Sequence, residues 1–342
     1  MILDPKRNGE RPGFATKADV DEFVDVLEKY ERGEIDTDKF REFRLTRGVY
    51  GQRQSEKHMI RVKIPQGVLT AAQLRALGRI AREKSRGFGH VTTRQNIQFH
   101  MVALADAEGA MRELLDVGIT TREACGNTVR NVTACPMAGV CAGEPFDVTA
   151  VSEAVTRFLL RHPDSQCMPR KFKIAFSGCA DDCAFGWIHD IGFLAKRGPG
   201  GEAGFRVVAG GGLATHPTPA TAVEDFLPAE AATRAALAIV RVQQKNGERK
   251  NRGRARLKYT IQRLGAEEFL RQYRAEYERI TEAEAPPLPR PAIAEAQART
   301  PTMTVAGVPG SWARHNVTPQ RQEGWTVVKV RLPIGDVTAD QF

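Results

Sequence analysis

Four of the six cysteines in this chain form two short pairs whose spacing could support metal chemistry. Five residues separate Cys135 from Cys141, and three separate Cys179 from Cys183. Each pair fixes two thiols locally, so only one long loop must close for four thiolates to meet. Four cysteine thiolates are the ligand set of an iron–sulfur cluster, and they can also hold a zinc ion.

The spacing favours an iron–sulfur cluster over zinc. Zinc-binding pairs usually place two to four residues between their cysteines, so the five between Cys135 and Cys141 are unusual for zinc. The N-terminal residues 1–7 lack the apolar stretch of a signal peptide. We therefore expect a cytoplasmic protein whose thiols stay reduced. A zinc site and thiols without a ligand are the alternatives to the cluster. Cys125 and Cys167 are interpreted as buried free thiols.

Composition sets the broad class. A length of 342 residues suggests about two domains, and an apolar fraction of 42% fits a globular protein. No apolar run approaches the ~18 residues of a membrane span, so no membrane partner is expected. The net charge of +9 reflects either a solvated basic surface or an acidic partner, such as an anionic cofactor, an oxyanion or an acidic electron donor. No nucleic-acid motif is visible, and no nucleic-acid partner is expected.

Hydrophobic periodicity predicts an α+β half-domain after a helical leader over residues 1–45. Residues 58–65 alternate as a half-buried strand that carries Arg61. A helix capped by Thr70 follows, and a single strand is expected over about 90–101. On that strand Arg94, Asn96 and Gln98 would share one face. With a further helix before residue 118, the order β-α-β-α predicts a ferredoxin-like half-domain over residues 46–123.

Residues 124–283 are predicted to form an α+β domain that binds the cluster. Lys171 and Lys173 would share one face of a strand that runs directly into Cys179. Further elements are a helix over 148–161, strands over 188–195 and 205–208, and helices over 229–244 and 259–279. The basic run 245–258 is either solvated or in contact with anionic groups. Residues 284–310, rich in Pro and Ala, indicate a linker.

An internal repeat links the two ends of the chain. Residues 52–73 return as residues 320–341, with 9 of 22 aligned positions identical. Residues 311–342 are therefore predicted to start a second ferredoxin-like half-domain. We interpret the chain as a duplicated protein that stops early in its second unit, which implies a missing second half or a partner subunit. Alternatively, the second copy completes a sheet with the first.

Three segments in the same order as the cysteine pairs carry a family resemblance. Residues 92–100 (TTRQNIQFH), 127–136 (NTVRNVTACP) and 168–174 (MPRKFKI) resemble the nitrite and sulfite reductase haemoproteins, which contain sirohaem and a 4Fe–4S cluster. The resemblance extends from about Val49 to the C-terminus. It implies that a 4Fe–4S cluster is bound by Cys135, Cys141, Cys179 and Cys183, and that Cys183 bridges it to the iron of sirohaem.

The resemblance also implies an activity and a set of site residues. The activity is the six-electron reduction of sulfite to sulfide, or of nitrite to ammonia, with an electron donor such as ferredoxin. The anion-binding catalytic residues would be Arg61, Arg130, Lys171 and Lys173, and the cofactor contacts would come from Arg94, Asn96, Gln98, Asn131 and Cys183. A lysine at position 173 favours sulfite. Here, unlike in the best-known assimilatory members, cysteines and cations occupy the same half, so either of two pseudo-symmetric sirohaem sites could be catalytic.

Three other functions remain open from the sequence. The chain could be an electron-transfer protein that carries only a 4Fe–4S cluster. It could be an inactive fragment of the reductase, or a basic binding protein stabilised by zinc.

Overall fold

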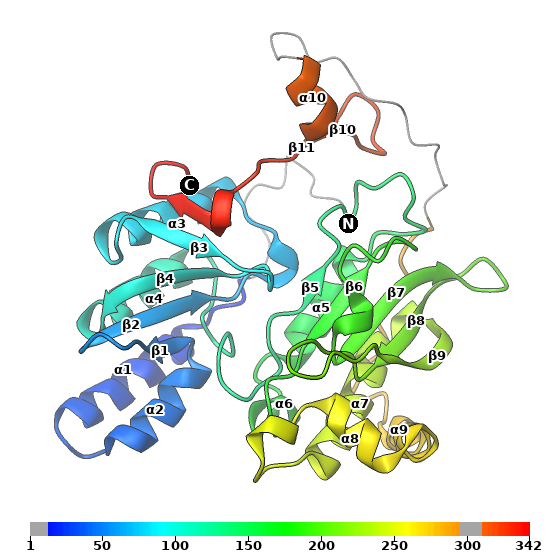
Figure 1. Ribbon diagram of the computed structural model, residues 1–342, viewed down its shortest axis with the longest axis horizontal. Helices are drawn as coiled ribbons and strands as arrows, with labels where there is room; N and C mark the ends of the chain where they lie inside the picture. Colours follow the sequence, from blue (N-terminus) through cyan, green and yellow to red (C-terminus); the bar gives the residue numbers. More distant parts are fainter. Residues whose placement is uncertain (1–12, 294–309) are drawn as a thin grey trace.

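The computed structural model describes residues 13–293 and 310–342. Two five-stranded sheets organise two units that lie side by side, and the last described segment contacts both (Figure 1). Within the described ranges, no helix is both long and apolar enough to cross a membrane.

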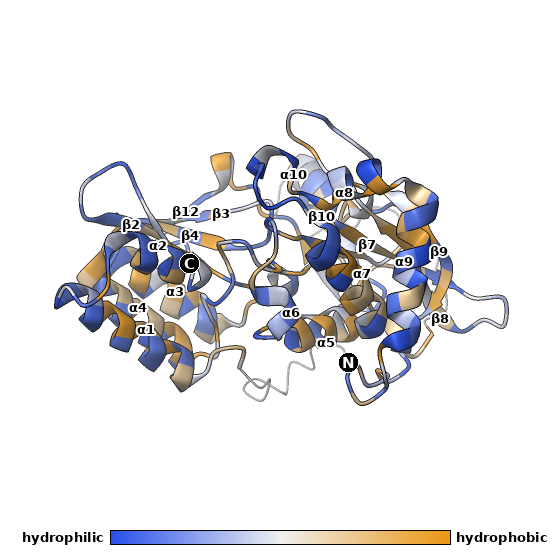
Figure 2. Ribbon diagram, turned by 90° about the horizontal axis from the view of Figure 1, so that it is seen from below, coloured by the Kyte–Doolittle hydropathy of each residue, from blue (hydrophilic) through white to orange (hydrophobic). Residues whose placement is uncertain are grey.

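The first unit is an antiparallel sheet in the order β1-β2-β4-β3-β12, with helices on one face (Figure 2). Its strands are β1 (Val49–Gly51), β2 (Lys57–Val62), β3 (Phe88–Val91), β4 (Ile97–Ala103) and β12 (Asp336–Thr338). Its helices are α1 (Lys17–Glu31), α2 (Thr37–Thr46), α3 (Ala71–Glu83) and α4 (Ala107–Asp116). Thr70 caps α3 in a reciprocal capping box with Gln73, as the sequence predicts.

The two faces of this sheet differ in polarity. Ile60 and Val62 of β2 are fully buried in the core beneath α3 and α4. Arg61 points to the opposite face, where it lies across from Gln98 of β4. This alternation confirms the half-buried strand, although Lys63 is itself buried against Glu123 at 3.4 Å.

Two expectations for this unit are wrong. The single strand expected over 90–101 is a hairpin of β3 and β4, joined by a turn at residues 92–96 in which Gln95 has φ 51°. Arg94 therefore lies in a turn, and it does not share a strand face with Gln98. The leader contains two helices, α1 and α2, where one was expected, and residues 1–12 lie outside the described residues.

The second unit is a mixed sheet in the order β5-β6-β7-β8-β9. β5 (Thr133–Ala134), β6 (Ile174–Ser177) and β7 (Ile191–Arg197) run parallel, whereas β8 (Ala203–Ala209) and β9 (Thr221–Pro228) continue antiparallel. The helices are α5 (Thr149–Leu159), α6 (Pro163–Gln166), α7 (Ala232–Asn246), α8 (Leu257–Leu264) and α9 (Ala266–Arg279).

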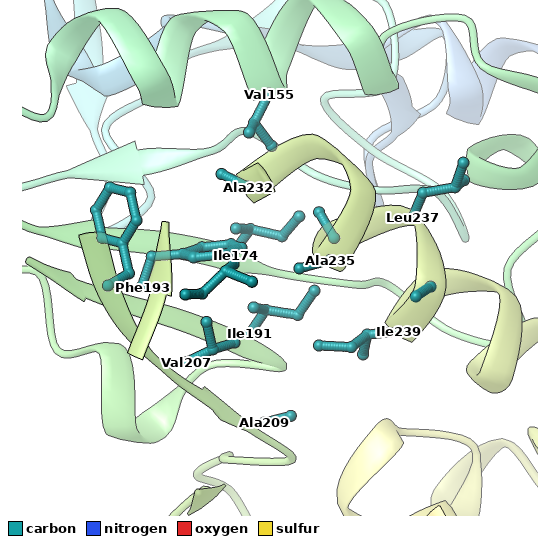
Figure 3. Packing of buried hydrophobic residues seen from close by; sticks show 14 of the residues in the cluster. Val155, Ile174, Ile191, Phe193, Val207, Ala209, Ala232, Ala235, Leu237 and Ile239 are labelled. Carbon is teal, nitrogen blue, oxygen red and sulfur yellow. The ribbon is translucent and has the colours of Figure 1, made fainter. Parts of the chain in front are cut away.

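The core of this unit lies between the sheet and α7. Ile174, Ile191 and Val207 of three neighbouring strands face Ala235 and Ile239 of α7 (Figure 3). All five side chains are fully buried. This packing holds β5 and β6 in place, and the two cysteine pairs begin at the ends of these strands.

Two expectations for the second unit need correction, and one strand was missed. The helix expected over 259–279 is two helices, because Gly265 at φ 87° ends α8 and α9 begins at Ala266. Lys171 and Lys173 precede β6 and do not lie within it. β9 was not predicted. The expected linker 284–310 falls partly on residues 294–309, which lie outside the described residues.

The internal repeat is visible in the backbone. β10 (Val317–Pro319) pairs with β11 (Thr326–Val328) in the register that β1 and β2 use, residue for residue at an offset of 268 positions. The 3-10 turn Pro65–Gly67 returns as Pro333–Gly335, with Gln66 at φ 57° and Ile334 at φ 50°. The helix α10 (Gly310–Asn316) precedes β10. The alternative interpretation also holds in part, because β12 pairs antiparallel with β3.

Candidate functional site

The thiols of the two cysteine pairs come together beside β5 and β6. Cys135 directly follows β5, and Cys179 follows β6. Burial raises the pKa of Cys135 to about 12, and the nearby Cys183 and Cys179 thiols raise it too. Burial also raises the pKa of Cys179, with Cys141 and Cys183 as neighbours that add to the shift. Each predicted ligand is therefore within electrostatic range of another, as a shared cluster requires.

Four cysteine thiolates are a ligand set that an iron–sulfur cluster or a single zinc ion can use. Among the described residues, no three His, Cys, Asp or Glu side chains are placed to hold one ion together. Zinc needs its ligand atoms about 2.0–2.3 Å from one centre. A 4Fe–4S cluster is larger and distributes four thiolates over its irons. Cys135 and Cys179 are buried, Cys141 is half-buried and Cys183 is exposed. Because ligands to such a cluster are thiolates, binding would release the protons that burial favours on Cys135 and Cys179.

The second pair is shaped by Asp182, a residue within it. Asp182 has φ 47°, and its carboxylate accepts hydrogen bonds from the Ser177 hydroxyl and from the Gly186 N–H at 2.8 Å. These donors hold the loop that carries Cys179 and Cys183. The side chain thus has a structural role within this cysteine pair.

The first pair is shaped by Glu144, whose side chain is fully buried. Its Oε2 accepts the Gly139 N–H at 3.0 Å, and its Oε1 lies 3.3 Å from Nη2 of Arg321. Burial raises the pKa of Glu144 to about 7, while the Gly139 N–H and Arg321 oppose the shift. Of the two remaining cysteines, Cys125 is buried as predicted, but Cys167 is exposed, contrary to the prediction.

A row of polar side chains crosses the open face of the first sheet. In adjacent strands, Arg61 lies opposite Gln98, Gln98 opposite His90, and His90 opposite Asp336. With its amide oxygen turned toward Arg61, Gln98 accepts a hydrogen bond from Nε of Arg61 at 2.9 Å. His90 Nδ1 lies 2.8 Å from Asp336 Oδ1. A hollow of about 320 Å³ beside this row is also lined by His100.

Arg130 is held close to Arg61 by backbone carbonyls. It donates to Gly126 O through Nε at 2.9 Å and to Ala124 O through Nη1 at 3.0 Å. Arg61 reaches the same Ala124 carbonyl at 3.5 Å. Burial, together with neighbouring cations that include Arg61, lowers the pKa of Arg130 to about 10. Two predicted anion-binding residues are therefore brought together.

Lys171 and Lys173 complete the predicted set, and neither ammonium has a hydrogen bond or ion pair within the described part of the chain. Burial lowers the pKa of Lys171, and Arg170 and Arg130 contribute. Burial lowers the pKa of Lys173 to about 8, with Arg94 and Arg256 as further causes. Both lysines are thus available to an anion.

Asp190 anchors this basic region. Its buried carboxylate accepts a hydrogen bond from Arg256 at each oxygen, at 3.0 and 2.7 Å. It also accepts one from the Lys173 backbone N–H at 2.8 Å. Arg256, in the basic run, therefore contacts a protein carboxylate. Within the described residues, Asp190 is the one carboxylate paired with any of the seven cations gathered here: Arg61, Arg94, Arg130, Arg170, Lys171, Lys173 and Arg256. Such an excess of positive charge suits a polyanion.

The turn at residues 92–96 joins the basic region to the cysteine pairs. Arg94 Nη2 lies 2.7 Å from His189 Nε2. The Gln95 side chain donates to the Ala134 carbonyl at 2.8 Å and accepts the Ala134 N–H at 3.1 Å. Gln95 therefore pairs with β5 as a strand would, one residue before Cys135.

Asn96 and Asn131, both predicted to contact a cofactor, are almost completely buried. Asn96 Oδ1 accepts the Ile64 N–H at 3.4 Å, and Asn131 Nδ2 donates to the Ile64 and Arg94 carbonyls at 2.7 and 3.0 Å. In this structure Asn96 ties the turn to the segment after β2, and Asn131 holds both against the second unit. Asn131 Oδ1 has no partner within the described residues.

His189, Asp190, Glu144 and Gln95 were missed by sequence reasoning. Each acts through a contact with a residue far away along the chain. Only the basic run that contains Arg256 carried a visible signal, and that signal was ambiguous.

Two family models cover most of this architecture. Residues 50–117 match the nitrite/sulfite reductase ferredoxin-like half domain, and residues 125–281 match the nitrite and sulphite reductase 4Fe-4S domain. The chain belongs to the nitrite and sulphite reductase family. This confirms the predicted family and the α+β fold class. The predicted domain boundaries and site roles stay predictions.

Known relatives show the same resemblance. The sulfite reductase [ferredoxin] of Mycobacterium tuberculosis H37Rv is 34% identical over 224 residues, which are 66% of this chain and 40% of the relative. The ferredoxin–nitrite reductase of Synechococcus elongatus is 31% identical over 296 residues, which are 84% of this chain and 54% of the relative. The solved structure of Mycobacterium tuberculosis NirA matches with a TM-score of 0.75 and 27% identity, over 97% of this chain and 62% of that chain.

Proposed function

We propose that this chain forms the first half of a reductase that converts sulfite to sulfide, or nitrite to ammonia, by six-electron reduction. One observation carries the proposal. The turn at residues 92–96 places the basic region directly against the strand that leads into the cysteine pairs. This contact supports a single site that combines the proposed anion-binding residues with the proposed thiolate ligands.

The proposed cofactors are a 4Fe–4S cluster and sirohaem, and the residues present fit both. Cys135, Cys141, Cys179 and Cys183 would hold the cluster, and their mutual proximity supports this role. Sirohaem carries many carboxylates, which suits the cations of the basic region and the hollow beside Gln98. Bound together, the two groups would supply electrons one at a time. Asn96 and Asn131 would lie next to the cofactor and shape the wall of its binding site.

The substrate would be bound by Arg61, Arg130, Lys171 and Lys173. Arginine pairs with oxyanions through a planar fork, whereas a lysine can both pair and donate a proton. With a pKa of about 8, Lys173 is mostly protonated at neutral pH but can release its proton readily. Two free ammonium groups close together favour sulfite, which carries more negative charge than nitrite.

The electron donor is proposed to be a ferredoxin. Both relatives described above carry ferredoxin in their names. The net charge of +9 would attract an acidic donor protein. A cytoplasmic location is part of the proposal, because free thiols persist in reducing compartments.

A second half-unit is proposed to complete the site. Val328 and Val330 are 52% and 75% exposed, whereas their first-repeat equivalents Ile60 and Val62 are fully buried. Within the part of the chain that the structure describes, no strand or helix buries this apolar segment of the second copy as its equivalent is buried in the first. A further unit, in the same chain or in a partner subunit, would cover this segment.

The experiment is an assay of the cofactor-loaded chain under anaerobic conditions with reduced ferredoxin. We expect little sulfite or nitrite reduction by the 342-residue chain alone, and turnover when a second family half-unit is supplied with it. Turnover at rates typical of enzymes by the chain alone would contradict the two-half proposal. No turnover in either arrangement, despite loaded cofactors, would contradict the proposed activity.

A further inference from the structure

The turn between β10 and β11 lies against the loop of the first cysteine pair. The Arg321 backbone N–H donates to the Val140 carbonyl at 2.8 Å, and Gln322 Nε2 donates to the Gly139 carbonyl at 2.8 Å. Figure 1 shows this segment above the second unit. Two consecutive carbonyls between Cys135 and Cys141 are therefore satisfied by residues from the second repeat.

Glu144 contacts the same loop from within the second unit. Its carboxylate accepts the Gly139 N–H at 3.0 Å and lies 3.3 Å from the Arg321 guanidinium. The Glu144 side chain is 0% exposed and that of Arg321 only 14%. A buried carboxylate of this kind depends on its cation, because removal of either partner leaves the other desolvated and unpaired.

The repeat supplies an internal comparison. Arg53 and Gln54 occupy the equivalent turn between β1 and β2, and they are the same residue types as Arg321 and Gln322. Both first-repeat residues are exposed. The hairpin therefore forms without burying this Arg-Gln pair, and the burial of Arg321 follows from its contact with the cysteine loop.

We propose that Arg321, Gln322 and Glu144 are positioning residues that hold the loop of Cys135 and Cys141 in its ligating shape. The loop has five residues between its cysteines, and Gly139 sits at φ 82°. Without the three side chains, the Gly139 N–H and carbonyl would lose their partners, the Arg321 backbone N–H alone would hold the loop at Val140, and the thiols would lose their fixed separation. Retention of the cluster would thus depend on docking of the second repeat. This inference rests on the cluster of the proposed function. Hydrogen bonds and charges around ligands also tune a cluster.

The test compares Arg321→Ala with Arg53→Ala, a matched substitution at the equivalent position of the first repeat. In the metal-free full chain, hydrogen exchange is measured at residues 137–144. In the anaerobically loaded chain, the rate of iron loss to a chelator is measured. We expect Arg321→Ala to accelerate both about tenfold, and Arg53→Ala to change neither. Arg321→Lys, which keeps the charge but loses the planar fork, should fall between them.

A milder variant guards against general unfolding. Gln322→Ala removes one hydrogen bond to Gly139, and we expect it to accelerate exchange at residues 137–144 while exchange in β7 and β8 is unchanged. Equal exchange and equal iron loss in the Arg321 and Arg53 variants would overturn the proposal. If the wild-type chain takes up no iron, the proposed function fails, and the exchange measurement alone then decides whether these residues position the loop.

Discussion

Arg94 and His189 lie 2.7 Å apart, Nη2 to Nε2, and connect the two units of the chain. Burial, and after it the charge of Arg94, lower the pKa of His189 to about 3, so the ring is neutral. Its Nδ1–H donates to the Phe185 carbonyl at 2.6 Å, which leaves Nε2 to accept from Arg94. A cation of the basic region is thereby fixed by a loop that begins at the second cysteine pair.

Substitution of His189 should release Arg94. His189→Ala removes a buried hydrogen bond to a charged group, and we expect the free energy of unfolding to fall by about 1.5–3 kcal/mol. His189→Gln keeps an acceptor within reach and should recover part of this loss. Urea unfolding followed by tryptophan fluorescence measures both. Equal destabilisation by the two variants would show that the acceptor does not matter.

Anion binding should weaken as Lys173 loses its proton. Its pKa is lowered from the ordinary lysine value to about 8. The ammonium is therefore charged below pH 8 and is neutral above it, so affinity for an anion falls as the pH rises through 8. For sulfate, whose charge is constant over pH 6–9, the loss of one charge pair should cost about 1 kcal/mol, or roughly fivefold in Kd. Calorimetry should show this change in the wild type and a flat profile for Lys173→Met.

Lys173 should also influence the choice of substrate in the completed enzyme. Lys173→Asn removes one positive charge, which matters more for sulfite than for singly charged nitrite. We expect the ratio of kcat/KM for sulfite to that for nitrite to fall by about 1–3 kcal/mol in transition-state terms. Both anions are assayed with the same donor. An unchanged ratio would show that Lys173 does not set the preference.

The repeat predicts opposite responses at two equivalent valines. Val62→Lys places an unpaired charge in the core, and we expect it to cost several kcal/mol or to prevent folding. Val330 follows β11 and is exposed, so Val330→Lys should change stability by no more than about 0.5 kcal/mol. Thermal unfolding of the 342-residue chain tests both. Val330→Lys should nevertheless abolish binding of a second half-unit, and unimpaired binding would contradict the proposed covered segment.

Local patterns in the sequence predicted local structure well. The alternation around Ile60 and the Thr70 cap are short-range signals, and both are confirmed. The turn at residues 92–96 was missed because it contains no Gly or Pro, and it is stabilised by the long-range contact of Gln95 with β5. The break at Gly265 was overlooked because the apolar pattern continues across it.

The candidate site was predicted in part. The cysteine pairs and the cations were visible by residue type and spacing. The residues that position them were not, because Asp190, His189 and Glu144 act on partners 17 to 177 positions away along the chain. A single sequence offers no periodic signal for such contacts.

The most direct test of the central claim is the iron and acid-labile sulfide content of the anaerobically reconstituted chain and two cysteine variants. We predict about four irons and four sulfides per chain in the wild type and in Cys167→Ser, whose thiol is exposed and outside both pairs. Cys179→Ser should lose most of both. Zinc in place of iron, or equal iron loss in Cys167→Ser and Cys179→Ser, would contradict the assignment of the two cysteine pairs to a 4Fe–4S cluster.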